Sequence, residues 1–232
     1  MSEHATTSHP AARVVELGET TRLETFSDGV FAIAITLLVL EIRVPPAHAD
    51  AAGTLGSALL RLWPSYLGYV ISFATIGIMW VNHHTMFEHI RRVDRTFLLI
   101  NVLFLLVVAF IPFPTAVVAE HLPDAEGRRV ATLFYGASFT LMAVVYNLVW
   151  RYGAGGEGRL LGPGADLEEA RAITRGYTWG PIIYLVATVI ALASPIASLV
   201  AHALIAIFFA LPPRRSARAV PDVPLVRGTR RA

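Results

Sequence analysis

The 232-residue chain is too apolar for an ordinary soluble domain, because 55% of its residues are hydrophobic, only 16% are charged and its mean hydropathy is +0.57. It contains no cysteine, which excludes disulfides, thiol catalysis and thiolate metal ligands. The formal net charge of +2 is too small to indicate a nucleic-acid partner. Composition therefore predicts an integral membrane protein whose chemistry, if any, rests on oxygen and imidazole groups.

Six apolar stretches come close to the roughly 20 residues that a helix needs to span a bilayer. They are residues 26–42, 62–82, 97–119, 130–150, 177–193 and 195–211. We therefore predict an all-α, polytopic membrane domain of six transmembrane helices over residues 22–211. Residues 1–21 and 212–232 are expected to be disordered cytoplasmic segments.

Two of the segments that connect these stretches have sequence features that predict their structure. Stretches 177–193 and 195–211 meet at Ser194 and Pro195, which predicts a tight hairpin, because proline starts a helix well but cannot continue one. The segment 151–176 begins rich in glycine and continues as LLGPGADLEEA. We expect it to form a flexible stretch followed by a short amphipathic helix near the lipid headgroups.

The arginines predict the orientation in the membrane. All nineteen basic residues are arginines, and the connections on one side hold only Arg43, Arg61, Arg128 and Arg129, which leaves fifteen for the other side. Because positive residues favour the cytoplasm, both termini are predicted to be cytoplasmic and the protein multi-pass in the plasma membrane.

A carboxylate opens the first apolar stretch, where a charge is costly: Asp28 follows Ser27 in its first turn. One interpretation is a helix cap near the membrane surface, where the positive end of a helix favours a carboxylate. Other polar residues expected at the same depth favour a network instead, because polar groups in lipid need partners. The predicted network joins Arg22, Ser27, Asp28, Trp80, His84 and Asn101.

Three neighbouring histidines, His83, His84 and His89, raise the alternative of a metal site, because imidazole clusters bind metal. Their spacing is HHxxxxH, Glu88 is the one acidic residue close to them on this side, and residues 151–176 contain no second histidine motif. Hydrogen-bonding histidines explain the pattern better, and we predict no metal and no cofactor.

The first apolar stretch also carries a stripe of residues spaced by three, four and seven, which places them on one helix face. Its members are Ile33, Thr36, Leu37 and Leu40. Such a stripe usually packs in a core or against lipid. A pore is the alternative, because Thr36 adds a hydroxyl to an apolar path that could gate ions, provided that several copies of the helix surround one axis.

Residues 22–42, RLETFSDGVFAIAITLLVLEI, resemble the first helix of the transmembrane protein 175 family, as do WVNHH at 80–84, RTFLLINVLFLL at 95–106 and PFPT at 112–115. The family signature, arginine, three residues and then Phe-Ser-Asp, falls on Arg22, Phe26, Ser27 and Asp28. The resemblance is close over residues 22–115. Beyond residue 115 it rests on hydropathy and on the number of spans.

Members of this family are potassium channels of animal endosomes and lysosomes and of bacterial plasma membranes. The resemblance implies six-helix subunits that assemble as homotetramers, with the first helix of each lining a central pore. It implies a hydrophobic constriction at Ile33, with the rest of the stripe in deeper layers. It also implies that Trp80, His84 and Asn101 hold the Phe-Ser-Asp motif in place.

The sequence thus predicts a potassium-favouring cation channel, not an enzyme, whose partners are potassium ions, the lipid bilayer and further copies of itself. Three alternatives stay open. A proton-coupled secondary transporter would use Asp28 and His84 as a relay. A membrane-bound metal enzyme would use the histidines, and a non-conducting scaffold would use the network and the stripe for packing alone.

Overall fold

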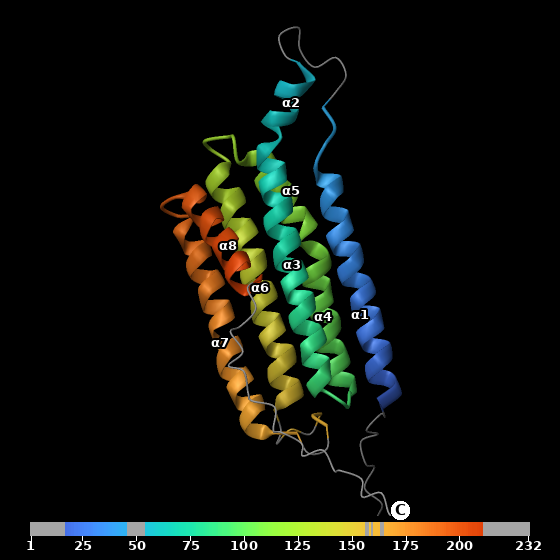
Figure 1. Cartoon of the computed structure of the whole chain (residues 1–232). Coiled ribbons are helices and arrows are strands. Elements are labelled where there is room, and N and C mark those ends of the chain that lie inside the picture. The colour runs from blue at the N-terminus through green and yellow to red at the C-terminus, as the bar shows by residue number, and fades with distance from the viewer. Residues whose placement is uncertain (1–16, 46–53, 156–157, 159, 163–164, 211–232) are drawn as a thin grey trace, which may run out of the picture.

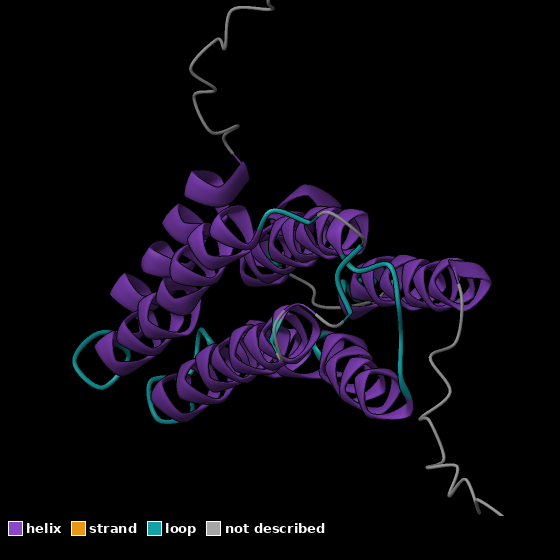
Figure 2. Ribbon diagram, turned by 90° about the horizontal axis from the view of Figure 1, so that it is seen from below, coloured by secondary structure: helices purple, strands orange, loops and turns teal. Residues whose placement is uncertain are grey.

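The computed structural model describes residues 17–45, 54–155, 158, 160–162 and 165–210, and within them the chain is helical, with one isolated bridge between Ile90 and Leu161. The helices stand side by side, with the connections at the two ends of the bundle (Figures 1 and 2). They are α1 (Leu17–Leu37), the 3-10 helix η1 (Leu38–Glu41), α2 (Leu55–Arg61), α3 (Trp63–His89), α4 (Arg95–Phe110), α5 (Pro112–His121), α6 (Arg128–Ala154), α7 (Leu167–Ile190) and α8 (Pro195–Ala210).

Four stretches of helix in the described chain are long and apolar enough to cross a membrane, which makes the chain an α-helical membrane protein. They are Thr20–Glu41, Trp63–His89, Arg95–His121 and Arg128–Ala154. α8 is apolar but has only 16 residues, and α7 has 24 residues with charged side chains in its first turns. The prediction of six spans therefore stays a prediction for α7 and α8.

The ends of the first span differ from expectation. The predicted start of the transmembrane domain at residue 22 stays a prediction, while the helix that contains it is already formed from Leu17, five residues earlier. At its other end the α-helix tightens into η1 before the chain becomes extended at Ile42. The rest of the predicted disordered segments, residues 1–16 and 212–232, lies outside the described residues.

The third predicted span is divided in two at Ile111. Pro112 and Pro114 follow this residue, and neither has an N–H to donate to the preceding helical turn. The Ile111 N–H instead bonds to the Val108 carbonyl, three residues back, at 3.2 Å. Hydropathy cannot reveal this break, because both α4 and α5 are apolar.

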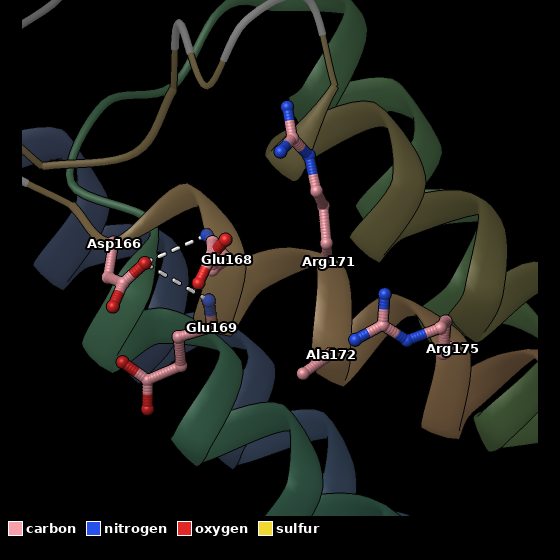
Figure 3. A pocket seen from close by; sticks show the side chains of 6 residues that line it. All are labelled: Asp166, Glu168, Glu169, Arg171, Ala172 and Arg175. Atoms are coloured by element: carbon pink, nitrogen blue, oxygen red, sulfur yellow. Dashed lines mark hydrogen bonds between the residues drawn. The ribbon is translucent and has the colours of Figure 1, made fainter.

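The short amphipathic helix predicted before the fifth apolar stretch is not separate but continuous with the helix of that stretch, α7. α7 begins at Leu167 because the Asp166 carboxylate accepts the N–H groups of Glu168 and Glu169, at 2.8 and 3.2 Å (Figure 3). Two acidic residues in the first turn suit the positive end of the helix. The helix then continues without interruption to Ile190, and a short turn before Pro195 leads into α8, as the predicted hairpin requires.

The segments that were predicted to share one side of the membrane lie at one end of the bundle. The start of α1, the α3–α4 connection and the connection from α6 to α7 meet at the lower end in Figure 1, whereas α2 and the α5–α6 and α7–α8 connections are at the upper end. The arginine-rich connections are thus on a common side. This arrangement supports the predicted orientation without testing which side is cytoplasmic.

Three polar side chains inside the bundle are paired with one another. The Ser72 hydroxyl of α3 lies 2.8 Å from that of Thr115 in α5 and 3.1 Å from that of Tyr135 in α6. All three residues are almost completely buried. Because an unpaired hydroxyl is costly at membrane depth, this cluster ties three helices together at one level.

A close approach of α6 and α7 depends on Gly136. A Cβ atom added there would lie 2.6 Å from Thr188 Oγ1 and 3.0 Å from Thr188 Cβ. Gly136→Ala is therefore expected to destabilise the protein by about 1–3 kcal/mol, because the two helices must separate. Thermal unfolding in detergent measures the effect. Gly77→Ala is the matched control, since a Cβ at Gly77 meets nothing within 4 Å, and an equal unfolding temperature for both variants would contradict the proposed close packing.

Candidate functional site on the first helix

One face of α1 attaches it to the rest of the subunit. The buried residues of this face recur every three or four positions, as one side of a helix requires. They are Leu23, Ser27, Phe31, Ala34 and Leu38. Phe31 is at their centre, with its ring 5.4 Å from the His83 ring of α3 and 5.9 Å from the Phe104 ring of α4. α1 is thus fixed along a single line of contact.

A chain of hydrogen bonds reinforces this contact near the arginine-rich end. The Ser27 hydroxyl donates to the Leu23 carbonyl at 2.8 Å, so its oxygen is left to accept from Asn101 Nδ2 at 3.0 Å. Because the amide nitrogen of Asn101 faces Ser27, its oxygen faces His83 Nε2, 3.0 Å away. His83 must then carry its proton on Nε2, and the chain of donors runs from α3 through α4 to α1.

A second link joins α1 to α3 outside this buried chain. The Trp80 indole N–H donates to Asp28 Oδ1 at 2.8 Å. The Asp28 carboxylate is only half-buried, and Trp80 is partly exposed. Such a charge-assisted bond is stronger than a neutral one, and it satisfies an acid that is otherwise costly in a membrane helix. We call the two links together, formed by Ser27, Asp28, Trp80, His83 and Asn101, the α1 clasp.

The buried chain of hydrogen bonds contains His83 and not His84, which the sequence predicted for it. His83 is completely buried, whereas His84 lies at the surface, with Nδ1 2.9 Å from Glu24 Oε1 and its ring stacked near that of Trp80. The orientation of α3 in the bundle explains this assignment. Buried positions of α3 recur at 72, 75, 76, 79, 83, 86 and 87, and this periodicity points His83, not His84, inward. The sequence contained no signal for the choice between the two histidines or for the contribution of Glu24.

Arg22 is the member of the predicted network that the structure does not bring together with the others. It is exposed on α1, beside Thr21, Thr25 and Phe26, in a shallow surface depression. Within the described part of the chain its guanidinium makes no hydrogen bond or ion pair. Its place on the uncovered side of α1 leaves it available to another copy of the protein.

The three histidines of the metal alternative are not assembled around a common point. His83 bonds to Asn101, His84 pairs with Glu24, and His89 Nδ1 lies 3.0 Å from the Thr85 carbonyl. Across residues 17–210, apart from the undescribed gaps, no three His, Asp or Glu side chains gather in a way that could hold a metal ion. The geometry therefore lends no support to a histidine-bound metal.

The predicted stripe lies on the side of α1 that is opposite its attachment. Ile33, Leu37 and Leu40 have 61%, 40% and 70% of their surface exposed, and Thr36 is exposed with them. Phe26 belongs to the same side and is also exposed. We call Ile33, Thr36, Leu37 and Leu40 the open stripe. A long apolar face with no cover from its own subunit marks an interaction surface or a lipid-facing surface.

The Thr36 hydroxyl has a defined orientation within the open stripe. Its Oγ1 donates to the Ile33 carbonyl at 2.9 Å, so the hydrogen of the hydroxyl is engaged by its own helix. The lone pairs of the oxygen stay available to a cation or to a hydrogen-bond donor. The open stripe therefore presents an oxygen ligand, rather than an O–H donor, which suits a cation.

Fold and site together define a polytopic α-helical membrane protein whose first span is clasped on one side and open on the other. The family model described as "Endosomal/lysosomal potassium channel TMEM175" matches residues 22–112, which include most of α1, the clasp and the open stripe. A potassium channel of Chamaesiphon minutus is 48% identical over 196 residues, 84% of this chain and 96% of that protein. The chain belongs to the TMEM175 family.

Two further comparisons agree with this assignment. A potassium channel of Streptomyces collinus is 43% identical over 193 residues, which cover 83% of this chain and 92% of the relative. The crystal structure of a lysosomal potassium-selective channel TMEM175 homolog from Chamaesiphon minutus superposes with a TM-score of 0.76 at 45% identity, and covers 83% of this chain and 97% of that one. These relatives are described as ion channels and not as enzymes.

Proposed function

We propose that the protein is a potassium-favouring cation channel, in which four copies place their α1 helices around a common axis. The observation that carries this proposal is the open stripe, an apolar face that its own subunit leaves uncovered directly opposite the attached face. Its relatives from Chamaesiphon minutus and Streptomyces collinus are named potassium channels, which supports the choice of ion. No catalytic step and no cofactor enter the proposal.

The proposed membrane arrangement has six spans, with α7 and α8 added to the four long apolar stretches. α8 has 16 residues, about 24 Å of helix, so it would end inside a hydrocarbon layer of about 30 Å. The common side of the arginine-rich connections supports cytoplasmic termini in the plasma membrane. The pore would then open to the cytoplasm near the α1 clasp.

Ile33 is the proposed constriction. Its exposed side chain would meet its three symmetry copies in a narrow apolar ring, where a passing ion loses part of its hydration shell. Potassium holds its water less tightly than sodium, so the cost falls more lightly on potassium. Selectivity of this origin should be modest, because no ring of carbonyl groups replaces the lost water.

Thr36 and the two remaining leucines would line the layers beyond the constriction. Because the Thr36 hydroxyl donates to its own helix, four Thr36 oxygens can face the axis as ligands for a partly dehydrated cation. Leu37 and Leu40 would continue the apolar lining. The clasp would have a positioning role, holding α1 at the tilt that brings these layers into register.

Single-channel recording of purified protein in a planar bilayer tests the proposal. We expect ohmic currents whose reversal potential, with potassium on one side and sodium on the other, shows a preference for potassium. Saturable flux that requires a proton gradient would instead identify the secondary transporter that the sequence left open. A protein that reconstitutes as a tetramer but passes no current would fit the scaffold alternative.

A further inference from the structure

A lateral cavity of about 490 Å³ lies between α3, α6, α7 and α8, and no described residue of α1 lines it. Its volume is in the range of sites that hold small organic molecules, about 300–1,000 Å³. It shares no residue with the open stripe. Met79 and Asn82 of α3 line it, whereas their neighbours Trp80 and His83 belong to the α1 clasp.

The cavity exists because α8 is short and because α7 presents two glycines to the space beside it. α8 ends at Ala210, while α3 and α6 each run for 27 residues, about 40 Å. Figure 1 shows α8 ending part-way along its neighbours. Phe208 and Phe209, at the end of α8, close one side of the cavity. On α7 the wall is formed by Gly176 and Gly180, where an added Cβ would meet nothing within 4 Å.

The wall is mostly apolar, and two of its polar side chains are already engaged. None of the described residues that line the cavity is charged. The Asn147 amide donates to the carbonyls of Ala143 and Tyr177, at 3.2 and 2.8 Å, and the Tyr146 hydroxyl donates to the Asn82 carbonyl at 3.0 Å. The half-buried Asn82 amide makes no hydrogen bond to the described residues. An ion or a polar peptide would therefore lose more hydration than so few partners can replace.

The position of the cavity in the membrane identifies its occupant. α3 and α6 both qualify as membrane spans, so the cavity lies between helices at membrane depth. A mostly apolar cavity at this depth is a better site for an apolar molecule than for an ion. We propose that the cavity binds one acyl chain of a bilayer phospholipid, whose headgroup stays outside at the membrane surface.

The bound chain would support the part of α3 that holds the clasp. The same two turns of α3 present Met79 and Asn82 to the cavity and Trp80 and His83 toward α1. An acyl chain that fills the cavity packs against the helix face next to the one that holds α1. The site is thus a place where the bilayer stabilises the subunit, whether or not the protein conducts ions.

Photocrosslinking tests the proposal on the full-length protein. The probe is phosphatidylglycerol with a diazirine on one acyl chain, added to phosphatidylethanolamine vesicles that contain the reconstituted protein. We expect crosslinked peptides to be enriched in the parts of α3, α6, α7 and α8 that line the cavity. Gly180→Leu should abolish this enrichment, because its side chain enters the cavity from a position with open space.

Gly77→Leu is the matched control, since Gly77 also has open space but does not line the cavity, and its crosslinks should equal those of the wild type. Removal of lipid with detergent should lower the unfolding temperature of the wild type more than that of Gly180→Leu. The leucine side chain partly fills the space that the lipid acyl chain would occupy. Crosslinks spread evenly over all lipid-facing helices would overturn the proposal. Enrichment that appears only after residues 212–232 are removed would also overturn it, by showing that the tail occupies the site.

Discussion

Ile33→Asn is expected to raise single-channel conductance several-fold and to reduce the preference for potassium over sodium. In the proposed pore, the apolar ring at Ile33 forces each ion to shed water, and four asparagine amides would keep the ring hydrated. Each ~1.4 kcal/mol removed from the barrier raises the rate of passage about tenfold. Bilayer recordings of the two proteins in symmetrical potassium and in mixed potassium and sodium measure both effects.

The substitution should leave the subunit itself intact. Ile33 has 61% of its surface exposed, on the side of α1 that packs against nothing in its own subunit. Ile207→Asn on α8 is the matched control, because Ile207 is 58% exposed and is not on α1. The role of Ile33 as the constriction is refuted if Ile33→Asn and Ile207→Asn both conduct like the wild type.

The apolar core of each span could be predicted from the sequence, because a spanning helix must be apolar over about 20 residues. The helix ends could not be, since they depend on local groups that hydropathy averages out. The Asp166 cap lengthened α7 by ten residues relative to the predicted start at 177. Pro112 and Pro114 divided the third span, and α2 went unpredicted because its seven residues are too few for a membrane signal.

The candidate site was predictable in its composition but not in its connections. Ser27, Asp28, Trp80 and Asn101 come together in the structure, because polar groups at one membrane depth must find partners. His83 and His84 differ by about 100° around the helix, and only the placement of the neighbouring helices decides which one points inward. The functional roles of the site residues stay predictions that the experiments above address.

Asn101→Leu is expected to loosen α1 more than any other single change in the clasp. Asn101 is completely buried and holds both Ser27 and His83, each at 3.0 Å. Leucine would leave the His83 Nε2–H without an acceptor and remove the donor to Ser27. A buried donor that loses its partner costs about 1–3 kcal/mol, and the bond between α4 and α1 is lost as well. Amide hydrogen exchange in detergent should therefore speed up in α1 while α6 and α7 stay protected.

The matched control for Asn101→Leu is Thr85→Leu, a change from a polar residue to leucine on α3, at a position outside both the clasp and the cavity whose hydroxyl donates to the Val81 carbonyl of its own helix. Its α1 exchange should equal that of the wild type. If the tetramer is held together through α1, Asn101→Leu should also shift the protein toward smaller assemblies in native mass spectrometry. Unchanged exchange in α1 would show that the apolar contacts of Phe31 and Leu38 position the helix without the clasp. Faster exchange with an intact tetramer would separate the clasp from assembly and restrict its role to setting the position of the open stripe.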